Sequence, residues 1–399
     1  PLWASAVLLT ERMVQPMDKP TVQDIFHRFY PAYLDQYSPS PVQAKVAHNI
    51  MNCKTGAYGA NVCVCEDCGF VQIHYNSCRN RCCPMCQAVP KEMWMDARRE
   101  DVLDAPYFHL VFTVPDILNP VIYSNQRLLY DALYHAASST ISELTADPKH
   151  LGAKVGYICI LHTWGSEMNF HPHIHTILLG GGLASNNQWK DNGENFFLPI
   201  RVISKMFRGK YLEELKRLWE EDKLVFHGTA EKFRNHYTFK ELLDSCYGMD
   251  WIPHCKKTFN GAQTVIKYLG KYTHRIAVSN HRIVRMDDDT VTFLVKDYRN
   301  EGQWKELTIS GVEFVRRFLM HVPPRRFVRI RQYGLLCSRT KSQKLTLCRN
   351  LLGCKKYLSK LRDMEMPEIL EHLYGIKVCV CKACGGHLGK PQMRMPLRC

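Results

Sequence analysis

Hydrophobic residues form two runs within residues 157–179, and a short polar turn at residues 166–169 separates them. Both runs are rich in β-branched and aromatic residues, so the pattern predicts a β-hairpin. The second run contains His173, Ile174 and His175. Because side chains in a strand alternate between its two faces, we expect both histidines on one face and Ile174 in the core behind them.

Two imidazoles on one strand face, with backbone positions about 7 Å apart, can chelate a single cation. Most such pairs are surface or hydrogen-bonded core histidines. Pro172, which marks a strand start or edge, and a glycine turn expected at residues 180–182 strengthen the metal interpretation. The third ligand is open between His162 in the first run and Glu167 in the turn. His162 shares the face only if the hairpin pairs an even-numbered residue with an odd-numbered one.

Elsewhere the pattern predicts mostly helices. Residues 20–58 favour two helices that a Ser-Pro-Ser-Pro break separates, and residues 91–105, 121–145, 211–223 and 233–246 are also helical in pattern. Residues 107–115 predict a buried strand, and residues 283–310 a hairpin that turns at three aspartates. The remainder of residues 183–255 is polar and irregular in pattern. This order predicts an α+β fold with a central antiparallel sheet flanked by helices.

Cysteine spacing predicts a structural zinc site. Cys65 and Cys68 form one Cys-x2-Cys pair, and Cys83 and Cys86 form a second after fourteen intervening residues. Four thiolates at this separation suit a tetrahedral zinc, and a zinc held only by sulfur is structural rather than catalytic. The choice of ligands stays open because further thiols lie nearby, at positions 63, 78 and 82.

A third Cys-x2-Cys pair lies near the C-terminus. Cys381 and Cys384 have no second pair close by unless Cys399 contributes. We therefore regard them only as a possible second zinc site.

Charge and composition point to a DNA-binding protein of a reducing compartment. The formal net charge is +15, which favours a polyanionic partner through counterion release. No run approaches eighteen apolar residues, so no membrane span is predicted. The apolar stretch at residues 2–9 lacks the basic lead-in of a secretory signal. We expect a cytoplasmic, nucleoid-associated bacterial protein whose cysteines stay reduced.

Two tyrosines form the second candidate site. Tyr268 and Tyr272 lie four positions apart in a stretch with a helical apolar stripe, so they share one helix face. A tyrosine pair at this spacing is usually simple packing. Here Lys267, Lys271 and Arg275 surround it, and such cations would lower a phenol pKa and hold a phosphate beside it.

Residues 311–350 contain ten Lys and Arg against one acid, with aromatic residues between them. This mixture suits single-stranded nucleic acid, whose bases stack on rings while its phosphates pair with cations, although a solvated basic face is the alternative. The arginines between the first two cysteine pairs also suit a phosphate. Together the candidate DNA-binding residues are Arg79, Arg81, Lys267, Lys271, Arg275, Arg325, Arg326, Arg329 and Arg331.

Several motifs occur in an order that resembles a known family. They are the first two cysteine pairs with the run at residues 77–87, Phe-Thr-Val-Pro at 112–115, Leu-His-Thr-Trp-Gly at 161–165, His-Pro-His-Ile-His at 171–175 and Tyr-Leu-Gly-Lys-Tyr at 268–272. Together they resemble the rolling-circle insertion-sequence transposases of the IS91 type, two-tyrosine members of the HUH endonuclease superfamily. The likeness covers roughly residues 40–340. Cys82 departs from it, because such proteins commonly have His there.

The resemblance implies a five-stranded antiparallel sheet, a tyrosine nucleophile and a divalent metal, Mg²⁺ or Mn²⁺, on the two histidines. We therefore expect a transposase that nicks and joins single-stranded DNA at element ends through a 5′-phosphotyrosine. It needs no nucleotide cofactor, and an oligomer is possible. A zinc-containing DNA-binding regulator without activity, or a related replication initiator or relaxase, is the alternative.

The expected domains are a helical region at 1–62, a zinc-binding domain at 63–100, a nuclease domain at 101–310 and a basic C-terminal region at 311–399.

Overall fold

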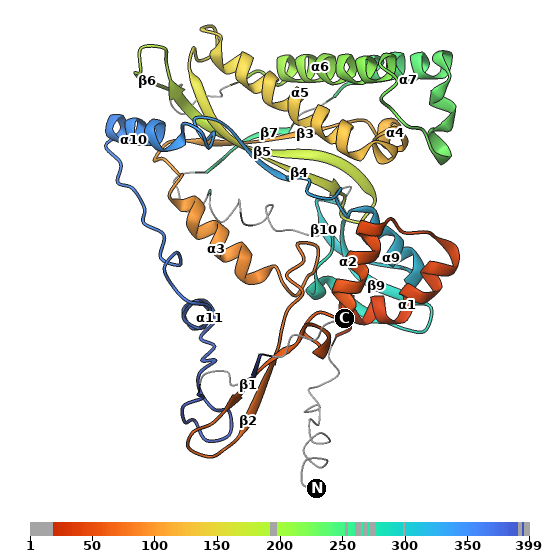
Figure 1. The fold of residues 1–399 in the computed structure, drawn as a ribbon. Coiled ribbons are helices and arrows are strands. Elements are labelled where there is room, and N and C mark those ends of the chain that lie inside the picture. The colour runs from red at the N-terminus through yellow and green to blue at the C-terminus, as the bar shows by residue number, and fades with distance from the viewer. Residues whose placement is uncertain are drawn as a thin grey trace.

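The computed structural model describes residues 19–191, 198–251, 254–259, 265, 270, 277–297, 300–389 and 393–394. At its centre lies an antiparallel sheet in the order β11-β4-β5-β3-β7, and β6 pairs with the far end of β5 (Figure 1). The strands are β3 (Tyr107–Thr113), β4 (Lys154–Trp164), β5 (Phe170–Leu183), β6 (Trp189–Asp191), β7 (His254–Phe259) and β11 (Ile330–Gly334). The α+β class with an antiparallel sheet flanked by helices is confirmed.

Helices cover both faces of this sheet. α5 (Gln126–Ala146) and α6 (Ile200–Glu220) lie over one face, with α4 (Asn119–Ser124) and α7 (His236–Gly248) at their ends (Figure 1). That face is apolar because alternate strand residues, such as Leu110, Phe112 and Ile174, point into its core. Ile174 is fully buried there, as predicted.

The opposite face holds a smaller core with α3 (Ala88–Arg99) and α10 (Lys341–Leu352). Ile158, Ile160 and Ile177 point from the strands into this core, and Met95 of α3 packs against it. None of the described helices is long and apolar enough to cross a membrane.

A second body packs at the turn of the β4–β5 hairpin. It combines α1 (Val22–Gln36), α2 (Pro41–Met51) and α9 (Gly311–Met320) with a sheet of β8 (Ile283–Met286), β9 (Thr290–Asp297) and β10 (Gln303–Ser310). Thr21 and Ser40 begin the first two helices with capping boxes, so the predicted break between them is confirmed. Trp164 and Met168 enter the core of this body from the hairpin.

A small cysteine-rich unit lies apart from both bodies (Figure 1). β1 (Ala60–Val64) and β2 (Val71–Tyr75) form a hairpin, and β12 (Met393–Arg394) pairs with β1. The chain reaches this unit twice. α3 leads away from it, and the segment after α10 returns to it through α11 (Met366–Tyr374). Short 3₁₀ turns complete the elements: Gly56–Tyr58, Asp116–Leu118, Gly228–Arg234 and Asn280–Arg282.

Three expectations about elements need correction. Residues 180–182 do not turn but continue β5 to Leu183, and neighbouring atoms leave almost no room for a side chain at these glycines. Residues 183–255 are less irregular than expected, because α6 begins at Ile200. The basic stretch 311–350 folds as α9, β11 and α10, so part of its charge faces other elements.

Candidate metal centre and thiol clusters

Three histidines meet on the face of the central sheet that α3 also covers. The β4–β5 register pairs His162 with His173, and Ile160 with His175. An even-numbered residue is therefore opposite an odd-numbered one, which is the condition for His162 to share the face. One ring nitrogen from each of the three side chains lies within 4.8 Å of the others, and His173 Nε2 is 3.1 Å from His175 Nε2. Glu167 is exposed in the turn.

Hydrogen bonds behind the rings orient two of these nitrogens. His173 Nδ1–H donates to the carbonyl oxygen of His171 at 2.7 Å, because a carbonyl can only accept. The neutral ring then carries its lone pair on Nε2, which faces the other histidines. His175 Nδ1 lies 2.9 Å from Nε2 of His109 on β3. This arrangement matches the usual support of metal-binding imidazoles, whose second nitrogen is held by a protein group.

His109 was not among the candidate residues from the sequence. It is buried, and its ring lies nearly parallel to that of His175, with centroids 5.1 Å and planes 14° apart. The alternation of side chains along β3 could have identified it. His109 lies on the same face of β3 as Val111, and Val111 pairs with His175. Only the strand order shows that this face adjoins His175.

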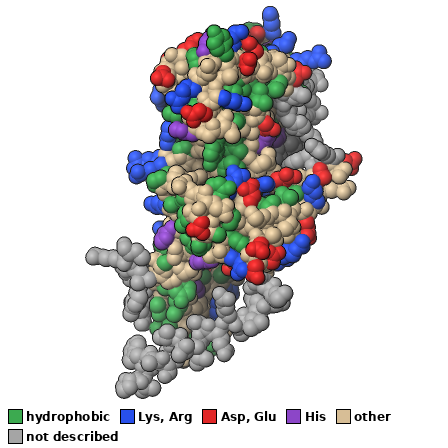
Figure 2. All heavy atoms as spheres, turned by 90° about the vertical axis from the view of Figure 1, so that its right-hand side faces the viewer, with side chains coloured by type: hydrophobic (Ala, Val, Ile, Leu, Met, Phe, Trp, Pro, Cys, Tyr) green, Lys and Arg blue, Asp and Glu red, His purple; other side chains and the backbone are tan. Residues whose placement is uncertain are grey.

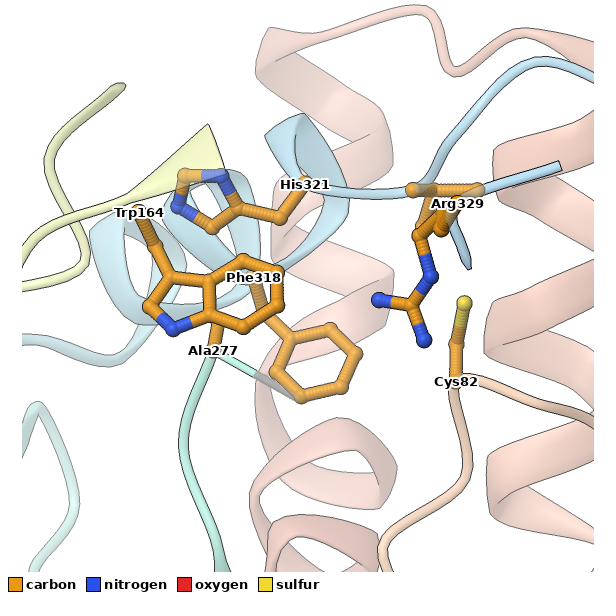
Figure 3. Close-up of a pocket in the computed structure, with 7 residues that line it drawn as sticks. Cys82, Trp164, Ala277, Phe318, His321 and Arg329 are labelled. Atoms are coloured by element: carbon orange, nitrogen blue, oxygen red, sulfur yellow. The ribbon is translucent and has the colours of Figure 1, made fainter. Parts of the chain in front are cut away.

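Trp164 closes the site on the side of the second body. Its ring stacks on His162, with centroids 4.6 Å apart and planes 19° apart. Behind it a small pocket lies between Trp164, Phe318 and His321 on one side and Arg329 and Cys82 on the other (Figure 3). Cys82 thus lies outside the thiol clusters, and burial raises the pKa of its thiol while lowering that of the Arg329 guanidinium.

His321, which follows α9, connects this pocket to the β4–β5 hairpin. Its Nε2–H donates to the carbonyl oxygen of Met168 at 3.0 Å, and Nδ1 lies 3.2 Å from Thr163 Oγ1. Burial lowers the pKa of His321 to about 4, and the nearby Arg316 and Arg317 act in the same direction. The ring is therefore neutral at neutral pH.

The thiols form two clusters rather than the single cage predicted from the sequence. Cys83 and Cys86 lie with Cys53 and Cys78, and their sulfurs are all within 4.8 Å of one another. Cys53 follows α2, so the cluster joins that helix to the start of α3. The predicted partners Cys65 and Cys68 are not in this cluster.

Cys65 and Cys68 instead lie with Cys381 and Cys384. The spacing of a Cys-x2-Cys pair does not say which other pair it meets, and the fold brings the C-terminal pair to the β1–β2 hairpin.

The candidate DNA-binding arginines differ in their surroundings. Arg79, Arg325 and Arg326 are exposed. Arg81 donates instead to the backbone oxygens of Pro324 and Phe327, and Arg331 pairs with Asp131 over the Tyr134 ring. Arg329 lines the small pocket behind Trp164. On the face that Figure 2 shows, Lys and Arg are interspersed with Asp and Glu, so no field of one sign covers it.

The predicted nucleophiles Tyr268 and Tyr272, with Lys267, Lys271 and Arg275, lie outside the described residues. Two nearby residues are described. Val265 is fully buried in the core that includes Met95 of α3. Gly270 also packs there, since a Cβ atom added to it would lie 2.0 Å from Met95 Sδ.

Comparison with known proteins agrees with this architecture. The family model "Transposase zinc-binding domain" matches residues 25–114, and the model "Putative transposase" matches residues 156–344. A protein described as "Putative transposase y4qJ", from Sinorhizobium fredii, is 40% identical over 369 residues, which cover 92% of this chain and 93% of the relative.

The transposase for insertion sequence element IS801, from Pseudomonas savastanoi pv. phaseolicola, is 30% identical over 309 residues, which cover 76% of this chain and 72% of the relative. No solved structure matches. The two domain matches and the long alignments establish that the chain belongs to the IS91 family of insertion-sequence transposases, with an N-terminal zinc-binding domain.

Proposed function

We propose that this transposase nicks and joins single-stranded DNA at the ends of its element by metal-assisted transesterification through a tyrosine. The observation that supports the proposal is the group formed by His162, His173 and His175 on one face of a rigid sheet. A purely DNA-binding protein has no use for three converging imidazoles. His162 is the proposed third ligand in place of Glu167.

The donor set fits a divalent cation with open positions. Three imidazole nitrogens leave room for oxygen ligands, such as water and a phosphate of the substrate. Nitrogen donors suit a transition ion better than Mg²⁺, which prefers oxygen, so we expect Mn²⁺ to bind more tightly. When bound, the cation supplies Lewis-acid polarisation of the scissile phosphate.

The chain provides orientation and the nucleophile. The bond from His173 to the His171 carbonyl fixes one imidazole, and His109 supports a second. The hydroxyl oxygen of Tyr268 or Tyr272 loses its proton and attacks the phosphorus in line. A tyrosine–phosphate bond forms, the bond to the 3′ oxygen breaks, and that oxygen takes up a proton to become a free 3′-hydroxyl.

The 5′-phosphotyrosine keeps the energy of the broken bond, so no nucleotide cofactor is needed. Attack by another 3′-hydroxyl on this linkage joins the strands and releases the tyrosine. A second tyrosine can cut the next strand while the first is still loaded. Val265 lies in the core that includes Met95 of α3, and Gly270 packs against Met95, so these two described residues lie on the same side of the sheet as the histidines.

The decisive experiment uses end-labelled single-stranded DNA from the element's own termini with Mn²⁺ or Mg²⁺. A denaturing gel and peptide mapping should reveal an adduct on Tyr268 or Tyr272 that EDTA abolishes. Tyr268→Phe and Tyr272→Phe test the nucleophiles, and Tyr237→Phe, at a tyrosine 79% exposed on α7, is the matched control.

Two variants test the metal ligands. His162→Ala should abolish cleavage and Glu167→Ala should leave it near normal, whereas the reverse result would exchange the two roles. Tight DNA binding with no adduct under any divalent metal would overturn the proposal and favour a regulator or an inactive copy.

A further inference from the structure

The N-terminal β1–β2 hairpin and the C-terminal segment meet at the second thiol cluster. Cys65 Sγ lies 3.5 Å from Cys384 Sγ, and Cys68 Sγ lies 3.8 Å from Cys381 Sγ. These pairs are 319 and 313 positions apart in the sequence. In a tetrahedral zinc site with Zn–S bonds of about 2.3 Å, neighbouring sulfurs are about 3.8 Å apart. The sulfur positions therefore already suit one zinc ion.

The two Cys-x2-Cys pairs have the same local backbone. Each is followed by a glycine with positive φ, +70° at Gly69 and +77° at Gly385. Each of these glycines donates its N–H to the carbonyl oxygen of the first cysteine of its pair, Gly69 to Cys65 at 3.0 Å and Gly385 to Cys381 at 2.9 Å. This turn brings both sulfurs of a pair to one side, as a metal knuckle requires.

Backbone amides support the sulfurs of the C-terminal pair. The N–H of Ala383 donates to Cys381 Sγ, and the N–H of Gly386 donates to Cys384 Sγ, both at 3.4 Å. Such bonds stabilise the thiolate form that a metal needs. The N–H of His387 also donates to the Asp67 carboxylate, which links the two knuckles directly.

Among the described residues, the apolar core at this cluster is small and consists of Cys63, Cys65, Cys381 and Leu388. Single backbone hydrogen bonds, from Glu66 N–H to His387 O and from Gly389 N–H to Val64 O, add to it. β12 has two residues and adds two register pairs to β1. A unit with so small a core generally needs a metal or a covalent link to stay folded.

We propose that Cys65, Cys68, Cys381 and Cys384 bind a second structural zinc ion that fastens the C-terminal segment to the N-terminal hairpin. The family match for the zinc-binding domain ends at residue 114, so two of the four ligands come from far outside that domain. The first cluster, Cys53 with Cys78, Cys83 and Cys86, then holds its own zinc within the matched region. This proposal does not depend on the tyrosine chemistry.

The zinc would hold the returning segment along α3. Between α10 and α11 this segment contacts the helix through Asp96, which accepts hydrogen bonds from Tyr357, Ser359 and the N–H of Leu361. Arg362 also pairs with Glu100, which caps the C-terminal end of α3. The zinc would fix the segment at the far end of this contact, as the path of the chain in Figure 1 indicates.

Metal content of the purified full chain is the first test. We expect two zinc ions per chain by mass spectrometry of the metal, and one for Cys381→Ser/Cys384→Ser. Cys65→Ser/Cys68→Ser and the quadruple variant should also hold one, because both pairs serve the same ion. The control Cys337→Ser/Cys354→Ser, at thiols outside both clusters, should keep two.

Other pairings predict different numbers. If Cys65 and Cys68 shared one zinc with Cys83 and Cys86, the Cys381→Ser/Cys384→Ser variant would keep all the zinc of the parent protein. If each pair bound its own ion, the quadruple variant would hold less zinc than either double variant. Either result would overturn the proposal.

A cleavage assay tests the fastening itself. A protease site placed in the exposed residues 375–377, after α11, separates the C-terminal knuckle from the body. After cutting, the fragment should co-elute with the body in the parent and in the Cys337→Ser/Cys354→Ser control. It should be released from Cys65→Ser/Cys68→Ser. Release from the zinc-loaded parent would contradict the proposal.

Discussion

At the scale of single residues, the metal site depends on how each imidazole is held as much as on its presence. His173 is fixed by a backbone carbonyl, and a strand carbonyl cannot be removed by a side-chain substitution. His175 is fixed by His109, which can be replaced. A substitution of His109 therefore tests how the orientation of His175 affects metal binding, while all three ligands stay in place.

We predict that His109→Leu, which fills the space but cannot accept from His175 Nδ1, raises the Mn²⁺ concentration for half-maximal cleavage about 10- to 100-fold. His109→Gln retains an acceptor oxygen and should restore most of the affinity. Cleavage at saturating Mn²⁺ should change much less in both, because neither variant removes a ligand. Metal titrations of cleavage, with thermal melting as a check on folding, make the measurement.

An equal loss in His109→Leu and His109→Gln, or a loss of maximal cleavage without any shift in metal dependence, would contradict a positioning role for His109. His227→Ala, at an exposed histidine before the 3₁₀ turn Gly228–Arg234, is the control and should match the parent.

At the scale of elements, the sequence predicted the hairpin but not its register. Alternation places His173 and His175 on one face from sequence alone. Whether His162 joins them depends on an even-numbered residue pairing with an odd-numbered one. The turn and the bulge between His162 and Trp164 set this register. The turn is held from outside the hairpin, because Arg282 of the second body donates to the backbone oxygen of Ser166 at 2.6 Å. Such long-range contacts leave no local pattern.

His321 couples α9 to the same hairpin, and we predict a pH-dependent stability from it. Its pKa is about 4 in the folded chain and about 6.5 when unfolded, so the unfolded chain binds more protons between these values. Stability is then full above pH 6.5 and falls as the pH drops towards 4. The loss between pH 7 and pH 5 should be about 2 kcal/mol.

Urea unfolding at both pH values measures this effect. Other groups also titrate in this range, so His321→Gln provides the comparison: its loss of stability between pH 7 and pH 5 should be smaller than that of the parent by about the same 2 kcal/mol. Equal losses in the two proteins would show that His321 does not remain neutral in the folded chain.

At the scale of the whole molecule, contacts between residues far apart in the sequence hold the parts of the chain together, and the sequence could not predict them. The sequence identified all three Cys-x2-Cys pairs but joined the wrong two, because neighbouring pairs look like natural partners. Cys53 was missed since it stands alone after α2, and only the fold brings it to Cys83 and Cys86. Spacing identifies ligand types, whereas the fold decides which ligands meet.

The net charge of +15 does not say which of the positive side chains contact DNA. Arg325 and Arg326 are exposed in the loop between α9 and β11, and Arg81 holds the backbone of this loop. Arg217 and Lys223 lie on or just after α6, on the sheet face away from the histidines, and both pair with Glu221. If DNA binds along this loop, only the first pair of charges should contact it.

We therefore predict that Arg325→Ala/Arg326→Ala makes the negative slope of log binding constant against log salt shallower by about 1.4 for single-stranded DNA, or about 0.7 for each phosphate that the variant no longer neutralises. Arg217→Ala/Lys223→Ala also removes two positive charges, but it should leave the slope unchanged. Fluorescence anisotropy titrations with a labelled strand at several salt concentrations make the comparison. Equal slopes for both variants and the parent would remove the loop from the interface, whereas equal reductions in both would mean that the protein attracts DNA through its overall charge.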